Sequence, residues 1–253
     1  MSTTPSRNGP VAAYLRELAE RLRQVAGDEL VGVYAGGSYA LAAFEPGRSD
    51  LDVAAVVRSP ATPMLKEEIV AAIRHETLAV PARGLEFVLY RLAVAREPTI
   101  AAAFELNLNT GAGMSFRADF EPRGIESHWF PVDRSILAEH GVTVVGPPAA
   151  DVFAPIPRQM VLPVILESMR WHARNTGPGD DAVLNACRSL RFALDGVWSS
   201  KPEAGQWALD RVPEPDVVRA ALAVRRGAAG LDPAAGAAIV DAAIGVVAGL
   251  AEE

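Results

Sequence analysis

Gly36-Gly37-Ser38-Tyr39 and Asp50-Leu51-Asp52 are the two stretches that decide how the first half of this chain folds. The preceding run, residues 30–35, is short, apolar and closed by glycines, which predicts a buried strand that ends in a turn. Residues 39–44 have a helix-forming composition. The free N–H groups of such a helix would face the turn at Ser38, so this turn is a candidate site for a phosphate group.

The two aspartates open a second apolar run, residues 51–57, which predicts another strand. Residues two apart on a strand point to the same side, so Asp50 and Asp52 would lie next to each other. Two adjacent carboxylates repel, and a divalent cation between them would relieve that repulsion. The alternative is that both aspartates are solvated acids at the end of a loop and that Gly37-Ser38 is an ordinary turn.

The pattern of Gly-Ser, eleven residues and Asp-x-Asp at the start of an apolar strand resembles the nucleotidyltransferase superfamily, which has a polymerase-β-like palm. The resemblance implies a third carboxylate on a later strand. Residues 84–90 form an apolar, strand-like run with one acidic residue, Glu86. Glu86 is therefore the candidate third acid, and the alternative is a surface residue of an edge strand.

Composition limits the classes of protein. The chain has 253 residues, half of them hydrophobic, which suits one large or two modest domains. The net charge of −7 argues against a general nucleic-acid binder, because such proteins need a basic face. The polar residues 1–10 lack the apolar core of a secretory signal, and residues 236–251 are short and interrupted by Asp241, so no membrane partner is expected. The single cysteine, Cys187, cannot form an internal disulfide, and a cytoplasmic location is the default expectation.

The order of elements predicts an α+β protein with two domains. Amphipathic spacing predicts helices at 11–26 and 64–78, and alternation predicts a strand at 104–109. A flexible loop at 110–113, a helix at 131–140 and an apolar turn at 142–145 are expected next. Beyond a proline-rich boundary, the pattern is helical at 160–174, 182–194, 204–210, 216–226 and 233–251. We therefore expect a catalytic domain with a mixed sheet over residues 1–156 and an all-helical bundle over residues 157–253.

The second half of the chain resembles one particular family within this superfamily. Residues 179–188, 198–201 and 205–209 are similar to the C-terminal helical domain of aminoglycoside 3''/9-adenylyltransferases, and residues 144–153 resemble the segment between their domains. The resemblance implies transfer of AMP from ATP to a hydroxyl of a streptomycin- or spectinomycin-type antibiotic, with release of pyrophosphate. It also implies that the helical domain contributes to binding ATP and substrate.

The resemblance assigns roles to particular residues. Two Mg²⁺ ions would be bound by Asp50, Asp52 and Glu86, and Glu86 would be either the general base or only a metal ligand. The residues implied in ATP binding are Gly37, Ser38, Ser49, Arg188 and Lys201.

Without the resemblance, Arg188 would be read as a salt-bridge partner of Asp180 or Asp181, and Lys201 as a solvated surface lysine. Trp171, Asp180 and Asp181, in the turn that corresponds to the antibiotic-binding turn of the family, are candidate contacts for an amine- or guanidinium-bearing sugar. Members of the family carry an aromatic residue soon after the strand at 104–108. This chain has Asn109-Thr110-Gly111 there instead, so the acceptor is left open.

Two other functions remain open at this point. One is a nucleotidyltransferase of the same architecture that acts on another small-molecule or protein acceptor, and the other is a non-catalytic nucleotide-binding protein. Three acids in one domain argue against the second. A monomer is expected. The four histidines show no metal-ligand spacing, and Cys187 is expected to be a buried thiol.

Overall fold

The structure is a computed structural model that describes residues 9–175, 177, 179–228 and 230–252. The chain divides into two compact units, one ending at Ile156 and one beginning at Pro157. Residues 1–8 of the polar N-terminal segment, and Thr176 and Pro178 of the candidate antibiotic-binding turn, lie outside the described residues.

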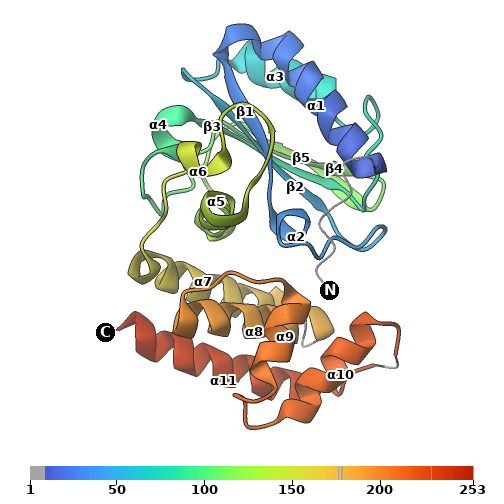
Figure 1. Cartoon of the computed structure of the whole chain (residues 1–253), viewed down its shortest axis with the longest axis vertical. Helices are drawn as coiled ribbons and strands as arrows, with labels where there is room; N and C mark the ends of the chain where they lie inside the picture. The colour runs from blue at the N-terminus through green and yellow to red at the C-terminus, as the bar shows by residue number, and fades with distance from the viewer. Residues whose placement is uncertain (1–8, 176, 178, 229, 253) are drawn as a thin grey trace. The chain divides into compact units, whose positions relative to one another are not determined.

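The first unit is built around a six-stranded mixed sheet with the order β5-β4-β3-β2-β1-β6 (Figure 1). Strands β2 and β3 are parallel, and each of the other neighbouring pairs is antiparallel. The strands are β1 (Leu30–Ala35), β2 (Leu51–Val57), β3 (Leu85–Arg91), β4 (Leu106–Gly111), β5 (Met114–Asp119) and β6 (Val142–Val145).

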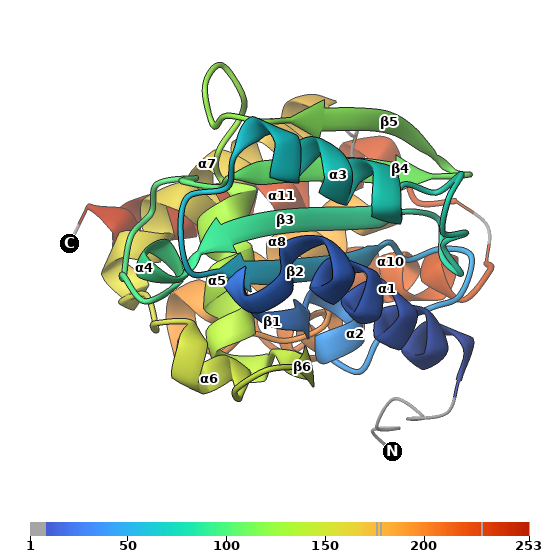
Figure 2. The same ribbon diagram turned by 90° about the horizontal axis from the view of Figure 1, so that it is seen from above.

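Helices cover both faces of this sheet. The amphipathic helix α1 (Pro10–Ala26), which the short η1 (Gly27–Glu29) follows, and helix α3 (Pro63–Ile73) pack on one face, as Figure 2 shows. Helices α5 (Trp129–His140) and α6 (Ala149–Val152) pack on the other face, against alternate residues such as Tyr34 and Tyr90. The remaining helices are α2 (Gly37–Ala40), directly after β1, and α4 (Leu92–Ala95), directly after β3.

Four details of the sequence-based expectation were wrong. Residues 110–113 are not a flexible loop but the tight connection of a hairpin, in which Gly111 pairs with Met114 and β5 follows. Residues 142–145 form strand β6, which pairs with β1. The helix after β1 is a single turn that already includes Gly37, and α3 ends at Ile73. Both missed strands lie at sheet edges. Strand β6 pairs with β1, which is far away in the sequence, whereas β5 forms a hairpin with β4 through a turn whose glycines indicated a flexible loop.

The second unit consists of five helices: α7 (Arg158–Asn175), α8 (Asp180–Asp195), α9 (Lys201–Ala208), α10 (Pro215–Arg225) and α11 (Pro233–Ala251). Helix α8 packs against each of the other four. Its start at Asp180 and the start of α9 at Lys201 lie close enough for an ion pair between α8 and α9. Ser200 and Glu203 form a capping box at the start of α9.

Within the described residues, α11 is the one helix that is long and apolar enough to cross a membrane by length and composition. Its buried residues, Gly236, Ile239, Val240, Ala243 and Val247, share one face. That face packs against α7 and α8. The buried stripe is that of a helix that packs against other helices along one side.

Candidate active site

The candidate site lies on the sheet face that α5 covers. Asp52 of β2 is in register with Glu86 of the parallel strand β3. Glu86 is in register with Asn109 of β4, which in turn faces Arg117 of β5. Because paired residues of neighbouring strands point to the same side, these four polar side chains form one row across the sheet. The structure therefore brings two acids that are far apart in the sequence next to each other.

The turn after β1 lies directly against this row. The backbone N–H of Gly36 donates to the carbonyl oxygen of Asp52 at 2.9 Å. Gly37 has a φ of +49°, and a Cβ atom on it would lie 1.8 Å from Oδ2 of Asp52, so only glycine fits here. The hydroxyl of Ser38 is buried and, within the part of the chain that the structure describes, has no hydrogen-bond partner. Such an unpaired buried hydroxyl at the start of a helical turn suits an oxygen-rich ligand.

Asp50 is held by a basic residue that the sequence analysis did not consider. Nε of Arg83 donates to Oδ1 of Asp50 at 2.9 Å, and Nη2 of Arg83 binds Oδ2. The two groups form a bidentate pair. Arg83 directly precedes the Gly84 that opens the run leading into β3, and its backbone N–H donates to the carbonyl oxygen of Ser49 at 3.2 Å. The loop before β2 is therefore tied to the start of β3.

Ser49 has a structural contact of its own. Its hydroxyl accepts a hydrogen bond from the backbone N–H of Glu45 at 3.0 Å. This bond closes the loop that leads to Asp50. Ser49 thus lies beside the candidate site, with its side chain turned toward its own loop.

The charges around Glu86 are unbalanced. Burial, and then the negative charges of Asp52, Asp50 and Asp133, raise the pKa of Glu86 to about 8, and Arg83 lowers it only in part. Asp133 comes from α5. A cation would be stabilising at this position, because it would offset both the burial of Glu86 and the repulsion from the other carboxylates.

These residues fit a magnesium ion by their chemistry. They supply carboxylate oxygens, which Mg²⁺ prefers, and the charges of Asp52, Asp50 and Asp133 add to burial in raising the pKa of Glu86. In the described part of the chain, however, no three acidic, histidine or cysteine side chains lie close enough together to hold a metal ion. The pairing of Asp50 with Arg83 accounts for part of this, because it directs one of the acids toward a guanidinium group.

Two of the predicted ATP-binding residues, Lys201 and Arg188, lie in the second unit. Nζ of Lys201 lies 2.6 Å from Oδ2 of Asp181, so this lysine is in an ion pair rather than solvated on the surface. Nη1 of Arg225, at the end of α10, lies 3.6 Å from Oδ1 of the same carboxylate. Nη2 of Arg188 donates to Oδ1 of Asn185 at 2.8 Å, one turn earlier on α8.

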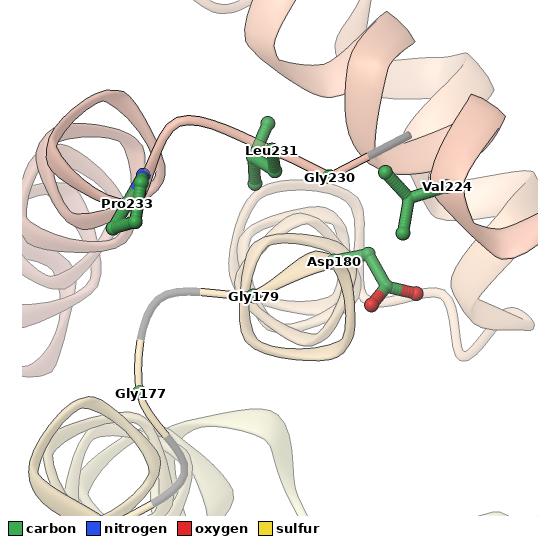
Figure 3. Close-up of a pocket in the computed structure, with 7 residues that line it drawn as sticks. All are labelled: Gly177, Gly179, Asp180, Val224, Gly230, Leu231 and Pro233. Carbon is green, nitrogen blue, oxygen red and sulfur yellow. The ribbon is translucent and has the colours of Figure 1, made fainter. Parts of the chain in front are cut away.

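The predicted substrate contacts are divided between two places. Asp180 lines a pocket of about 380 Å³ at the start of α8, shown in Figure 3 with Val224 on one side and the segment of Gly230 and Leu231 on another. Trp171 lies on α7, where its backbone carbonyl accepts a hydrogen bond from the side chain of Asn175 at 2.8 Å. Asp181 is bound by Lys201 and Arg225, as described above. The pocket belongs to the helical unit and contains none of the acids of the sheet.

The sequence analysis missed Arg83, Asp133 and Arg225. A basic residue three positions before Glu86 was a usable signal for Arg83, because an exposed start of a strand next to two carboxylates favours an ion pair. Asp133 and Arg225 gave no signal, since helical periodicity places them only on the polar sides of their helices.

The fold is a mixed sheet covered by helices, followed by a unit of five helices, and a solved structure shares this fold. The structure is similar to that of the spectinomycin adenyltransferase AAD(9) from Enterococcus faecialis, which was solved with ATP and spectinomycin. The TM-score is 0.67 at 15% sequence identity, and the match covers 96% of this chain and 100% of that chain. This similarity confirms the predicted α+β fold.

The matches found by sequence are to aminoglycoside adenylyltransferases. Residues 151–248 match the family model of the aminoglycoside adenylyltransferase C-terminal domain. Aminoglycoside (3'') (9) adenylyltransferases from Rhizobium radiobacter and Klebsiella pneumoniae are each 33% identical to the chain over 101 residues. These matches cover 37% of this chain and only 36% and 37% of the two relatives. The resemblance to aminoglycoside adenylyltransferases is thereby confirmed, and by sequence it is carried by little more than a third of the chain.

Proposed function

We propose that this protein transfers AMP from ATP to a hydroxyl group of an aminoglycoside antibiotic and releases pyrophosphate. The observation that carries the proposal is the row of Asp52 and Glu86 on neighbouring strands, directly beside the Gly37-Ser38 turn. The match of residues 151–248 to an aminoglycoside adenylyltransferase domain supports the choice of acceptor.

Binding of the nucleotide is assigned to residues of both units. In the first unit, the buried hydroxyl of Ser38 and the N–H groups at the start of α2 would donate to phosphate oxygens, and Gly37 leaves room for them beside Asp52. Ser49 holds the loop that carries Asp50. In the second unit, Arg188 and Lys201 would bind phosphate oxygens, and the fork of a guanidinium group suits this task.

Asp50, Asp52 and Glu86 would hold magnesium, for which we propose two ions. Bound magnesium would stabilise negative charge on the attacking and leaving oxygens of the phosphoryl group. For Asp50 to take part, its carboxylate has to exchange Arg83 for a new partner. Gly36 and Gly37 fix the backbone and the side chain of Asp52 from the other side.

Glu86 is the proposed general base. The oxygen of the acceptor hydroxyl attacks the α-phosphorus, the bond from this phosphorus to the pyrophosphate oxygen breaks, and the hydroxyl proton passes to the Glu86 carboxylate. Without magnesium, burial and the charge of Asp52 raise the pKa of Glu86 to about 8, so this carboxylate takes up a proton more readily than an ordinary glutamate; ligation of magnesium by Glu86 is the competing role. A positioned base of this kind contributes roughly 10²- to 10⁴-fold to the rate.

For the acceptor, we propose contacts with Trp171, Asp180 and Asp181. An aromatic ring and carboxylates are the groups that recognise a cationic amino sugar. Of these, Asp180 lines a pocket of the helical unit, whereas Asp181 already binds two basic side chains.

The test is pyrophosphate release from MgATP with a panel of aminoglycosides that includes streptomycin and spectinomycin. We expect release with at least one drug from the wild-type protein and none from Asp50→Asn. Glu86→Gln should still bind MgATP but transfer AMP at least 100-fold more slowly, in the range expected for loss of a general base. An unchanged kcat in Glu86→Gln would remove this residue from the chemical step.

A second candidate function is transfer of a nucleotide to a different acceptor. The observation that favours it is Asn109, a small polar residue in register with Glu86, close to the point where the family resemblance implies an aromatic side chain. No pyrophosphate release across the antibiotic panel, together with tight binding of MgATP, would favour this function over the first.

A further inference from the structure

Two basic side chains of the helical unit bind the first turn of α8, and a third lies further along the same helix. Lys201 begins α9 and Arg225 ends α10, and both bind the carboxylate of Asp181, at 2.6 Å and 3.6 Å. Arg188 lies seven residues further along α8, and its charge acts on Lys201. Helices α8, α9 and α10 pack against one another, so these contacts lie where the three meet.

One half-exposed carboxylate, that of Asp181, pairs with two largely buried cations. The side chains of Lys201 and Arg225 are only 23% and 9% exposed, whereas Asp181 is 55% exposed and largely hydrated. Cations that have lost water need strong partners, and a carboxylate half in water is a weak one. Among the described residues, the charges that act on Lys201 are those of Asp181, Arg188 and Arg225.

The pKa of Lys201 reflects its burial and its basic neighbours. Burial lowers the pKa of Lys201, Asp181 raises it, and the repulsion from Arg188 and Arg225 lowers it further, so that the net direction is down. A site that makes a lysine easier to deprotonate would be stabilised by an added anion.

The charges of Lys201 and Arg188 also lower the pKa of His172 on α7. Nδ1 of His172 lies 2.8 Å from the carbonyl oxygen of Ser168, which makes Nδ1 the protonated nitrogen of the neutral ring. Burial lowers the pKa of His172, and Lys201 and Arg188 lower it further. The imidazole next to the cluster is therefore neutral at pH 7 and does not add to the repulsion.

We propose that Arg225 is a third phosphate-binding residue, which acts with Arg188 and Lys201 on the polyphosphate group of the nucleotide. This inference rests on the proposed function and deepens it. A chain of phosphates presents several negatively charged oxygens, so it can engage three cations at once, which a single carboxylate cannot do. In this view Asp181 holds Lys201 and Arg225 side by side until phosphate oxygens replace its own.

The alternative is that Arg225 only ties α10 to α8. The chain offers a matched control for this reading, Arg219, which lies on the same helix. Its side chain is 57% exposed and is paired within the helix with Asp216 at 2.5 Å. Replacing Arg219 removes the same charge from the same helix without touching the cluster.

The experiment measures binding of inorganic tripolyphosphate to the full chain by calorimetry, at low ionic strength and in the presence of EDTA. Without a metal ion, the acids of the sheet cannot retain the probe. The Gly37-Ser38 turn is the same in every variant, so differences in binding between variants report on the substituted cations. We expect Arg225→Gln to weaken binding by about 10- to 100-fold, the range for loss of one charge-assisted contact. Arg225→Lys should recover part of the affinity, and Arg219→Gln should stay within about two-fold of the wild type.

The result that overturns the proposal is tripolyphosphate binding in Arg225→Gln equal to that in Arg219→Gln. A wild-type protein that binds no tripolyphosphate at about 1 mM, the weak limit of specific binding, would also overturn it. Melting curves of all variants show whether a loss of affinity comes from a loss of fold, and partial rescue by lysine excludes that explanation.

Pyrophosphate release with the antibiotic panel, measured on the same preparations, separates this inference from the proposed function. If tripolyphosphate binding depends on Arg225 but no drug causes release of pyrophosphate, the phosphate site is supported and the proposed acceptor is wrong. Release by Arg225→Gln with the wild-type KM for ATP would keep the proposed function and overturn the role of Arg225.

Discussion

Replacing Glu86 by glutamine should stabilise the metal-free protein. Glutamine has nearly the shape of a protonated glutamate, so the change removes the negative charge and leaves the packing between β2 and β4 intact. Asp52, Asp50 and Asp133 all repel that charge, and Arg83 attracts it. The wild-type residue is thus maintained at a cost in stability, as is common for residues of an active site.

The magnitude follows from the pKa of Glu86, which is about 8 in the folded protein, against an ordinary value of 4.5. Between these two pH values the folded state binds more protons at this position than the unfolded state, so the wild-type stability falls as pH rises. One pKa unit corresponds to about 1.4 kcal/mol, so the shift in the pKa of Glu86 destabilises the wild-type protein by at most about 5 kcal/mol. Because Glu86 is partly accessible to solvent, we expect a gain of about 2–4 kcal/mol for Glu86→Gln above pH 8.

The assay is urea denaturation in EDTA, with the wild type and Glu86→Gln compared at pH 4.5, 6.5 and 9. The two free energies of unfolding should nearly coincide at the lowest pH and diverge steadily up to pH 8. A glutamine variant that is equally stable or less stable at pH 9, or a difference that does not depend on pH, would refute the reasoning.

Glu105 provides the control for this prediction because it is a buried acid of the same unit with the opposite surroundings. Its carboxylate binds Nε of Arg91 at 2.7 Å and Nζ of Lys66 at 3.3 Å, and accepts from the backbone N–H of Ala61 at 3.2 Å. Glu105→Gln should therefore lower the free energy of unfolding, by about 1–3 kcal/mol. The two glutamine variants are predicted to shift stability in opposite directions at pH 9.

Three further predictions concern other parts of the chain. Gly37→Ala should lose about 1–3 kcal/mol of stability and most of the transfer activity, because its Cβ would displace the carboxylate of Asp52; full activity with an unchanged melting temperature would contradict this. Burial raises the pKa of the Cys187 thiol to about 12, so Ellman's reagent at pH 8 should label it only after denaturation, and rapid labelling of the native protein would be evidence against a buried thiol. Ser200→Ala should cost about 1 kcal/mol in thermal denaturation, since it removes the cap that pairs with Glu203, and no change in melting temperature would show that the cap contributes nothing.

Much of the fold could be predicted from local sequence. The first helix, the strands at 30–35 and 51–57, and the last helix at 233–251 follow from periodicity and from glycine and proline signals, which act within a few residues. The turn at Gly37 was predictable for the same reason, because its backbone requirement is local. Strand β6 was not predictable in this way, because its partner β1 is far away in the sequence. Strand β5 was missed because the glycine-containing segment at 110–113 indicated a flexible loop and not the turn of a hairpin with β4.

The sequence by itself determined which residues could carry chemistry: a glycine-serine turn, an Asp-x-Asp strand, and an isolated acid at Glu86. Only the tertiary structure decided that Glu86 stands in register with Asp52, because strand register depends on the packing of two whole sheet faces. It also decided the partners of the charged groups, Arg83 for Asp50 and Arg225 for Asp181. Such pairs are set by which side chains meet in space and by how much water each one loses, and neither quantity is contained in the spacing of residues along the chain.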